Sequence, residues 1–326
     1  MQRILRTLFW CCALLFALFV VDLAQAQNYP NRPIRMIIGF AAGGPTDVIG
    51  RIIAQDMSET LGQPVLVENK TGANSLVATE YVAHSEHDGY TLLFTSLSHI
   101  VNYLIMPDVK YHPLKDFAPI SNGALLPMLV VTSASSPLSN IQDVITAARE
   151  KPGTVLYGSA GAGGSAHLAA AMLSTATGTQ MTHVPYRGNA PALNEVMAGR
   201  LTFMFYPVIG VAEYVAAGRL KILAVGTPER SPDFPDVPTL AESGLKGFEK
   251  TAPWVGMLAP AGTPPSVIKK LSDAVRASLA KPETIARVRK LGGIPVGDTS
   301  EEFTRYLEGD MARWSEVIKA SGIKME

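Results

Sequence analysis

Cysteine is the residue that this chain uses least: two of 326 residues, Cys11 and Cys12, both near the N-terminus. The rest of the chain therefore has no thiol for a disulfide, for redox chemistry or for holding a metal. An excess of charge of one sign is also lacking, because 28 basic residues face 28 acidic ones. Such a balance gives nucleic acid no electrostatic attraction, so we predict no nucleic-acid partner.

The N-terminal residues follow the order of a secretion signal. Arg3 and Arg6 precede an apolar run over residues 8–21, and Ala24-Gln25-Ala26 supplies the small residues of a cleavage site. A membrane anchor is the alternative, but the run holds 14 residues, fewer than the roughly 20 that span a bilayer. We predict a signal peptide over residues 1–26 and an exported, mature chain that begins at Gln27.

Strand-like and helix-like segments alternate along the rest of the chain, which predicts an α/β fold with parallel sheets and crossover helices. Its 300 residues suffice for two domains of about 150 each. Crossings expected near 125–130 and 223–227 would insert one lobe, 126–227, into another made of 27–125 plus 228–326. The expected strands are 34–38, 65–68, 91–94, 128–132, 154–157, 181–184, 201–206 and 222–225, and the expected helices are 46–61, 75–83, 141–150, 167–177, 191–198, 265–280, 282–291 and 300–320.

A glycine turn follows the first expected strand. Gly43 and Gly44 lie between that strand and a helix that Thr46 or Asp47 can cap. The unpaired N–H groups at such a helix start, with the positive end of the helix dipole, favour a carboxylate or phosphate. Taken alone, the motif is better explained as an ordinary strand-to-helix turn.

A second glycine-rich turn, residues 158–167, matches a loose dinucleotide fingerprint. That fingerprint requires an acidic residue at the end of the next strand, and this strand ends His183-Val-Pro-Tyr186 without one. The turn instead offers backbone donors, the hydroxyls of Ser159 and Ser165, and the imidazole of His167, which could equally cap or pack. A third turn, 186–191, opens another helix and has the same ordinary reading.

Catalytic and metal motifs are poorly represented. No Gly-x-Ser-x-Gly elbow is present, and Ser165 and His167 stand two apart, so on a helix they point to different sides. A phosphate loop ending Gly-Lys-Ser/Thr is absent as well. His84 and His87 lie beside acidic residues, but no further histidine or cysteine cluster completes a metal site. We therefore predict no catalysis, no metal and no cofactor.

Residues at other strand ends are candidates for a pocket wall, because ligands of open parallel sheets collect at the carboxyl ends of strands. Ser96, Ser98 and His99 follow one expected strand, and Tyr206 ends another. A solvated loop is the alternative for His99, and core packing is the alternative for Tyr206. For Trp254 we expect core or hinge packing.

Eight segments in this order, which span essentially the whole mature chain, resemble the Bug family, the solute receptors of tripartite tricarboxylate transporters. They are Tyr29-PNRPIRMIIGFAAGGPTD, Leu61-GQPVLVENKTGAN, Asp88-GYTLLF, Gly158-SAGAGGSAHL, His183-VPYRGNAPALNEVMAGR, Leu220-KILAVGTPER, Pro235-DVPTLAESG and Trp254-VGMLAPAGTP. The resemblance implies a two-lobed periplasmic binding protein (type II-like), whose ligand cleft lies between lobes joined by two crossings. It implies a monomeric receptor, not an enzyme, that delivers a small di-, tri- or aromatic carboxylate to membrane transporter subunits.

The resemblance also assigns the ligand contacts to the three turns. The matching positions are Gly43, Gly44, Thr46, Asp47, Ser159, Gly163, Ser165, His167, Tyr186 and Gly188. Phe40, Asn74, Ser96, Ser98 and Tyr206 complete the expected ligand-binding set.

The chain departs from the family pattern at three places. Ala42 replaces the proline usual before the glycine pair, and Ala171 replaces a common acidic residue. Tyr206 stands where the family often has aspartate, which favours an aromatic or less polar carboxylate over an amino acid. Two other functions stay open: a secreted hydrolase that uses Ser165 and His167, and a sensor that presents its ligand to a signalling protein.

Overall fold

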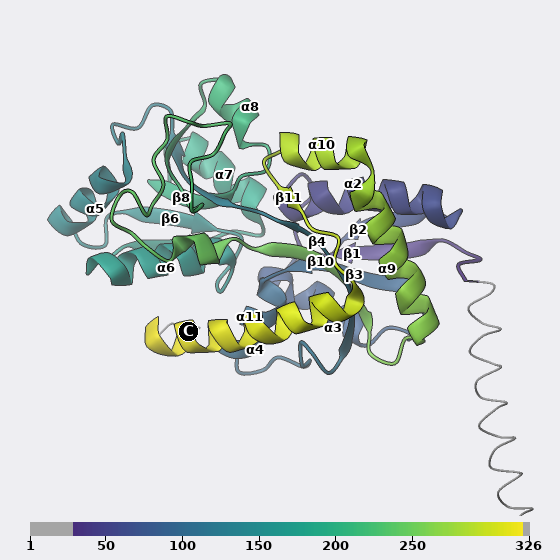
Figure 1. Cartoon of the computed structure of the whole chain (residues 1–326). Helices are drawn as coiled ribbons and strands as arrows, with labels where there is room; N and C mark the ends of the chain where they lie inside the picture. Colours follow the sequence, from purple (N-terminus) through teal and green to yellow (C-terminus); the bar gives the residue numbers. More distant parts are fainter. Residues whose placement is uncertain (1–28, 322–326) are drawn as a thin grey trace, which may run out of the picture.

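Two sheets form the centre of the computed structural model, which describes residues 29–321 (Figure 1). The first sheet has the strand order β11-β4-β10-β3-β1-β2, and the second has the order β7-β6-β8-β5-β9. The strands are β1 (Ile34–Ile38), β2 (Val65–Asn69), β3 (Thr91–Ser96), β4 (Phe117–Leu125), β5 (Met128–Ser133), β6 (Leu156–Ser159), β7 (Thr182–Pro185), β8 (Phe203–Pro207), β9 (Leu220–Val225), β10 (Trp254–Pro260) and β11 (Ile294–Pro295).

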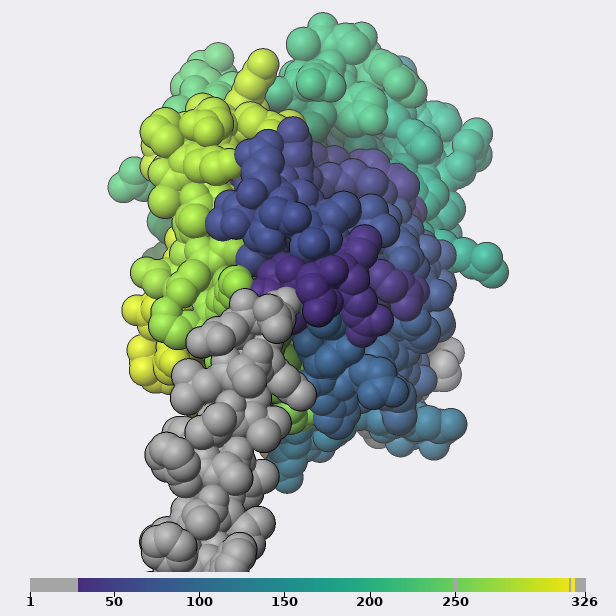
Figure 2. Space-filling model, turned by 90° about the vertical axis from the view of Figure 1, so that its right-hand side faces the viewer, coloured from purple at the N-terminus to yellow at the C-terminus, as the bar shows by residue number. Residues whose placement is uncertain are grey.

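Helices cover both sheets, as the alternating sequence pattern predicts. The first lobe carries α2 (Pro45–Leu61), α3 (Leu76–Ala83), α4 (Ser98–Ile105), α9 (Pro265–Ala280), α10 (Pro282–Lys290) and α11 (Ser300–Ser321). The second carries α5 (Ile141–Glu150), α6 (Ser165–Thr177), α7 (Asn189–Met197) and α8 (Val211–Ala216). In Figure 2 the N-terminal and C-terminal segments, purple to blue and green to yellow, form one body with the teal second lobe above it.

The sheets are mixed, which corrects the expectation of parallel sheets. In the first sheet β10 runs antiparallel to β3 and β4, and in the second β5 runs antiparallel to β8 and β9. The strand β4 was not predicted, because Ser121 and Asn122 interrupt its apolar pattern although both are buried. The strands β10 and β11 and the helices α4 and α8 were not predicted either.

The two crossings between the sheets lie side by side. β4 ends at Leu125 and β5 begins at Met128, close to the expected first crossing. Between them the N–H of Leu126 donates to the carbonyl of Pro253, just before β10, at 2.9 Å. The two connecting segments therefore touch, and Pro253 restricts its own backbone dihedral at this point.

The segment after β9 stays with the second lobe. Thr239 forms a bridge with Val225, and Leu240, Leu245 and Phe248 are buried in the core of the second sheet. The chain rejoins the first sheet at β10. This packing places residues 239–248 with the second lobe, whereas the sequence analysis assigned 228–326 to the first.

The C-terminal helix connects the lobes along one side. α11 packs against β4 and reaches α6 of the second lobe, as the yellow helix in Figure 1 shows. Trp314 lies there in a buried apolar cluster with Val101 of α4 and Leu168 of α6. Within residues 29–321 no helix has both the length and the apolar composition of a membrane span. The predicted signal peptide, 1–26, lies outside the described residues.

Candidate ligand-binding site

The first glycine turn places the start of α2 at the cleft. Gly43 adopts a left-handed φ of 77°, and Gly44 is the N-cap with φ −78° and ψ 165°. The expectation that Thr46 or Asp47 caps the helix is wrong, because Pro45, whose fixed φ suits a first helical position, already begins it. The N–H groups of Thr46 and Asp47 therefore fall in the first turn, where a helix offers no internal acceptor.

Asp47 holds this turn from inside the helix. Its carboxylate accepts hydrogen bonds from the N–H of Gly43 at 2.9 Å, from Arg51 Nε at 2.9 Å and from Asn69 Nδ2 at 2.8 Å. Burial raises the pKa of Asp47, but these hydrogen bonds outweigh it, and the net pKa lies below the ordinary value. The side chain is thus committed to the shape of the turn.

The second glycine turn repeats this geometry at the start of α6. Gly163 has a φ of 75°, and Gly164 is the N-cap with φ −67° and ψ 159°. Here the N–H of Gly163 donates to Nδ1 of His167 at 2.9 Å. The N–H groups of Ser165 and Ala166 then lie in the first helical turn and have no acceptor within the helix.

A stack of two histidines supports the second turn. The rings of His167 and His183 are parallel within 5°, with centroids 3.9 Å apart. Ser159 Oγ donates to the carbonyl of Gly161 at 2.8 Å, so His183 Nε2, 2.6 Å away, is the donor in their contact. Burial lowers the pKa of His167 to about 4, and burial together with the neighbouring His167 lowers that of His183 to about 3. Both rings are therefore neutral near pH 7.

Two connected cavities lie between the lobes. The inner chamber has a volume of about 20 Å³ and the outer cavity one of about 440 Å³. The inner chamber is lined by Phe40, Thr46, Asn74, Ser96, Leu126, Ala160, Gly164, Ser165, Ala166, Asn189, Pro207, Pro253 and Val255. The outer cavity is lined by Gly39, Phe40, Gly72, Ala73, Asn74, Ser75, Met106, Ala160, Gly161, Ala162, Pro185, Tyr186 and Arg187.

The lining is suited to an anion. No aspartate or glutamate is among these lining residues, and Arg187 is the one charged side chain. Thr46 and Ser165, from the starts of α2 and α6, face the same inner chamber from opposite lobes. The chamber therefore lies at the positive ends of two helix dipoles, where a carboxylate is stabilised.

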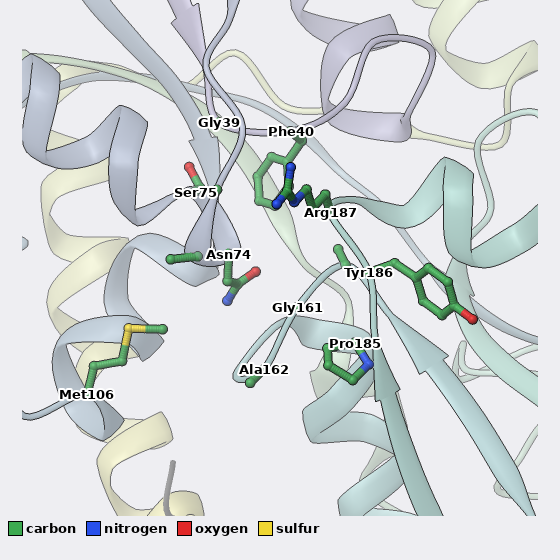
Figure 3. Close-up of a pocket in the computed structure, with 13 residues that line it drawn as sticks. Gly39, Phe40, Asn74, Ser75, Met106, Gly161, Ala162, Pro185, Tyr186 and Arg187 are labelled. Atoms are coloured by element: carbon green, nitrogen blue, oxygen red, sulfur yellow. The ribbon is translucent and has the colours of Figure 1, made fainter. Parts of the chain in front are cut away.

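The structure brings together five of the predicted site residues at the inner chamber: Phe40, Thr46, Asn74, Ser96 and Ser165. Tyr186 lines the outer cavity, with its ring directed away from the centre (Figure 3). Eight others line neither cavity and belong to the turns or to the wall behind it: Gly43, Gly44, Asp47, Ser98, Ser159, Gly163, His167 and Gly188.

Tyr206 departs from its predicted place in the pocket wall. It is 3% exposed, belongs to the apolar core of the second lobe, and lines neither cavity. Side chains point alternately to the two faces of β8, so the neighbouring residue Pro207 lines the inner chamber and Tyr206 does not. His99 is likewise buried, with Nε2 2.9 Å from the carbonyl of Pro113, and does not lie in a solvated loop. Trp254 packs as expected, and its Nε1 donates to Asp310 at 3.0 Å.

Several lining residues were not predicted from the sequence. Arg187 and Asn189 lie within the third turn that it singled out, so their position was a usable signal. Leu126 and Pro253 reach the chamber because the two crossings adjoin it. Met106 follows α4, a helix that the sequence pattern did not predict.

The lobes touch each other across the cleft. A Cβ at Gly188 would lie 3.0 Å from Cβ of Ala41, and one at Gly161 would lie 3.1 Å from Cβ of Asn74. Glycine at these points therefore allows the second lobe to close onto the first. The two lobes are therefore in contact at the cleft in this structure.

The described part of the chain has no cluster of side chains that could hold a metal ion. Within residues 29–321 no three histidine, cysteine, aspartate or glutamate side chains are grouped to hold a metal ion. His84, one of the two histidines considered above, has its Nδ1 2.7 Å from the carbonyl of Glu80 in its own helix.

Comparisons with known proteins agree with this architecture. Residues 49–323 match the model of the tripartite tricarboxylate transporter family receptor. A UPF0065 protein of Pseudomonas sp. strain P51 is 37% identical over 90% of this chain and 88% of its own length, and BugT of Bordetella pertussis is 33% identical over 93% of both.

Solved structures of the same kind superpose closely. R. palustris Rpa4515 with adipate has a TM-score of 0.87 at 33% identity, covering 91% of this chain and 99% of its own. MatC of Rhodopseudomonas palustris, solved with bound malate, has a TM-score of 0.85 at 30% identity, covering 89% of this chain and all of its own. These two lobes, with helix starts facing each other over an acid-free chamber, have the periplasmic binding protein fold, and the chain belongs to the tripartite tricarboxylate transporter receptor family, which includes the Bug proteins.

Proposed function

We propose that this protein is an extracytoplasmic receptor that captures a small organic carboxylate and delivers it to the membrane subunits of a tripartite transporter. One observation carries the proposal: the starts of α2 and α6, on opposite lobes, supply Thr46 and Ser165 to one inner chamber. A single carboxylate there would accept hydrogen bonds from both lobes and hold them together. The adipate and malate bound by the two R. palustris relatives support this ligand class.

Two lobes that share one ligand would open to admit it. We assign the first lobe to residues 29–125 and 252–321 and the second to 126–251, with the hinge at the paired segments of Leu126 and Pro253. Only a ligand that binds the closed form better shifts the protein toward it. Small-angle scattering should show a smaller radius with a saturating ligand than without it, and an equal radius would argue against this hinge.

The hydrolase alternative has less support. Nδ1 of His167 accepts the N–H of Gly163 and is not available to activate a hydroxyl. Ser159 does contact His183, but the serine is fully buried and its hydroxyl already donates to Gly161. In neither pair is a histidine nitrogen free to accept the proton of the serine hydroxyl. We therefore propose binding without chemistry.

A ligand screen tests the proposed function. Thermal unfolding should be followed with acetate, succinate, adipate, malate, citrate and benzoate, each beside its amide. A carboxylate at 100 times its dissociation constant should add about 2.7 kcal/mol of stability, while the amide adds far less. Equal stabilisation by acids and amides, or none by any acid, would overturn the proposal. N-terminal sequencing of the protein from a periplasmic extract, expected to begin at Gln27, tests export.

A further inference from the structure

An unpaired amide oxygen faces the junction of the two cavities. Asn74 is 5% exposed, lines both cavities, and its Oδ1 has no hydrogen-bond partner among the described residues. Figure 3 shows the amide extending from the first lobe toward Gly161 of the second. A buried acceptor without a partner is costly, so it requires a donor when the cleft is closed.

The orientation of this amide is fixed by its neighbour. The backbone carbonyl of Asn74 can only accept a hydrogen bond. The side-chain atom of Asn102 that lies 2.9 Å from it must therefore be the donor, Nδ2. The other end of the Asn102 amide is therefore its oxygen, and Asn74 Nδ2 donates to it at 3.0 Å. Exchanging oxygen and nitrogen in either residue would bring like groups together. The unpaired end of the Asn74 amide is therefore its oxygen, and it lies against Gly164 of the inner chamber, where an added Cβ would be 3.2 Å away.

The backbone around Asn74 is strained. Ala73, Asn74 and Ser75 have φ values of 43°, 52° and 72°, a left-handed run of three residues that are not glycine. Each such residue costs about 1–2 kcal/mol, and strain of this kind gathers where a ligand is held. The run turns the Asn74 side chain into the cleft.

We propose that Asn74 selects carboxylates that carry a hydroxyl next to the carboxyl group. The inner chamber, a narrow space of about 20 Å³ lined by Thr46 and Ser165, receives carboxylate oxygen between the helix starts. The adjoining carbon then lies at the junction, where its hydroxyl donates to Oδ1 of Asn74, and the rest of the ligand occupies the outer cavity. A second amide oxygen in the inner chamber, that of Asn189, is buried and also unpaired.

A hydroxyl fits these acceptors better than an ammonium group. Neither cavity is lined by a carboxylate, so an ammonium would lose its hydration without gaining an anionic partner from the protein. A neutral hydroxyl supplies one donor without that loss. The inference rests on the proposed function, since it names a class of carboxylate for the same site.

Matched ligand pairs test the selectivity. Calorimetry should compare malate with succinate and lactate with propionate on the mature protein. The wild type should bind each hydroxy acid at least tenfold more tightly, as sites that hydrogen-bond a substrate hydroxyl do. In Asn74→Gly, whose left-handed backbone glycine accepts readily, the ratio should fall to within about twofold. Asn189→Ala should lower the ratio by about threefold, for the loss of one neutral hydrogen bond.

Controls separate the possible failures. Asn194→Ala, an exposed asparagine on the same helix as Asn189, should keep the wild-type ratio. A wild-type ratio near one, or a tenfold ratio that survives in Asn74→Gly, would overturn the inference while leaving carboxylate binding intact. Absence of binding by every acid, hydroxylated or not, would instead overturn the proposed function. Thermal unfolding of each variant shows whether a lost ratio reflects a lost fold.

Discussion

The two glycine turns at the cleft have nearly the same backbone and different chemistry. In each, a left-handed glycine precedes an N-cap glycine that donates to the carbonyl three residues earlier, at 3.2 Å in the first and 3.1 Å in the second. In each, the side chain at the third helical position accepts the N–H of the left-handed glycine, at 2.9 Å. That side chain is Asp47 in the first lobe and His167 in the second.

The difference shows how a binding site for an anion can contain an aspartate. The carboxylate of Asp47 is matched by Arg51 and Asn69 within the same lobe, so its charge is compensated before the ligand arrives. His167 supplies an acceptor without charge, because burial keeps its ring neutral. Both turns therefore offer backbone donors to the chamber without adding net negative charge to it.

Removing the charged acceptor should have the largest effect on stability. Asp47→Asn should lower the free energy of unfolding by about 2–3 kcal/mol, since hydrogen bonds to a buried charged group are the strong ones. Asp143→Asn is the matched control, because Asp143 occupies the same helical position in α5 on a more exposed surface. It should cost about 1 kcal/mol or less. Equal losses in urea unfolding would mean that the buried network around Asp47 has no special strength.

Lowering the pH should destabilise the second glycine turn before the first. The folded pKa values of His167 and His183, about 4 and about 3, lie below the ordinary 6.5. The unfolded protein therefore binds more protons between pH 6.5 and 4, and stability from these rings, complete above pH 6.5, falls as the pH falls. Asp47 has a lowered pKa and keeps its contribution until the pH drops below its ordinary value of 3.8.

Amide hydrogen exchange can follow this separation residue by residue. On lowering the pH from 7 to 4.5, protection of the Gly163 N–H, corrected for intrinsic exchange, should fall by about 50-fold, the loss expected for one histidine whose pKa is 6.5 in the unfolded chain and about 4 in the folded protein. Protection of the Gly43 N–H should be unchanged. His167→Gln should remove the pH dependence at Gly163. Parallel losses at both glycines would contradict the comparison.

Arg187 should distinguish ligands with one charge from ligands with two. It is exposed and lines the outer cavity (Figure 3). Arg187→Gln should weaken dicarboxylate binding by up to about fivefold, the usual limit for an exposed ion pair. Monocarboxylates should bind as before. Arg200→Gln, an arginine already paired with Glu195, is the control. If both ligand classes weaken equally, Arg187 does not meet a second carboxylate.

The smallest effect should come from Tyr206. Because it packs in the core and lines neither cavity, Tyr206→Phe should change every ligand affinity by less than about twofold, the error of most additive comparisons. Burial raises the pKa of its hydroxyl, which is consistent with a residue away from solvent. If the change in affinity differs from one ligand to another, Tyr206 contacts the ligand after all.

The sequence predicted the local part of this site. Strand, glycine turn and helix follow from short-range patterns, so the positions of Thr46 and Ser165 could be read from the chain. Such short-range patterns do not show which residues far apart in the sequence lie close together in the fold. The strand of Tyr206 is apolar on both faces, so no alternation tells which residue faces the cavity. Asn74 is placed by strained backbone and by Asn102, neither of which has a sequence signature.

The fold shows the same limit. The apolar strands and amphipathic helices were predicted, but β4 was not, because the polar residues inside it contact a residue far along the chain, Asp298. Ser121 Oγ donates to the carbonyl of Asp298 at 2.8 Å, and the N–H of Asn122 donates to the Asp298 carboxylate at 2.6 Å. Antiparallel pairing of β10 with β4 likewise joins segments that are remote in the sequence, so short-range patterns could not show that the sheets are mixed.

The central claim is that one carboxylate is bound by both turns at once. Amide NMR of the isotopically labelled protein, titrated with malate and with its diamide, tests it most directly. The resonances of Thr46 and Asp47 on α2 and of Ser165 and Ala166 on α6 should shift together, with one dissociation constant, and only for the acid. Saturable malate binding that moves one turn and leaves the other unchanged would contradict it.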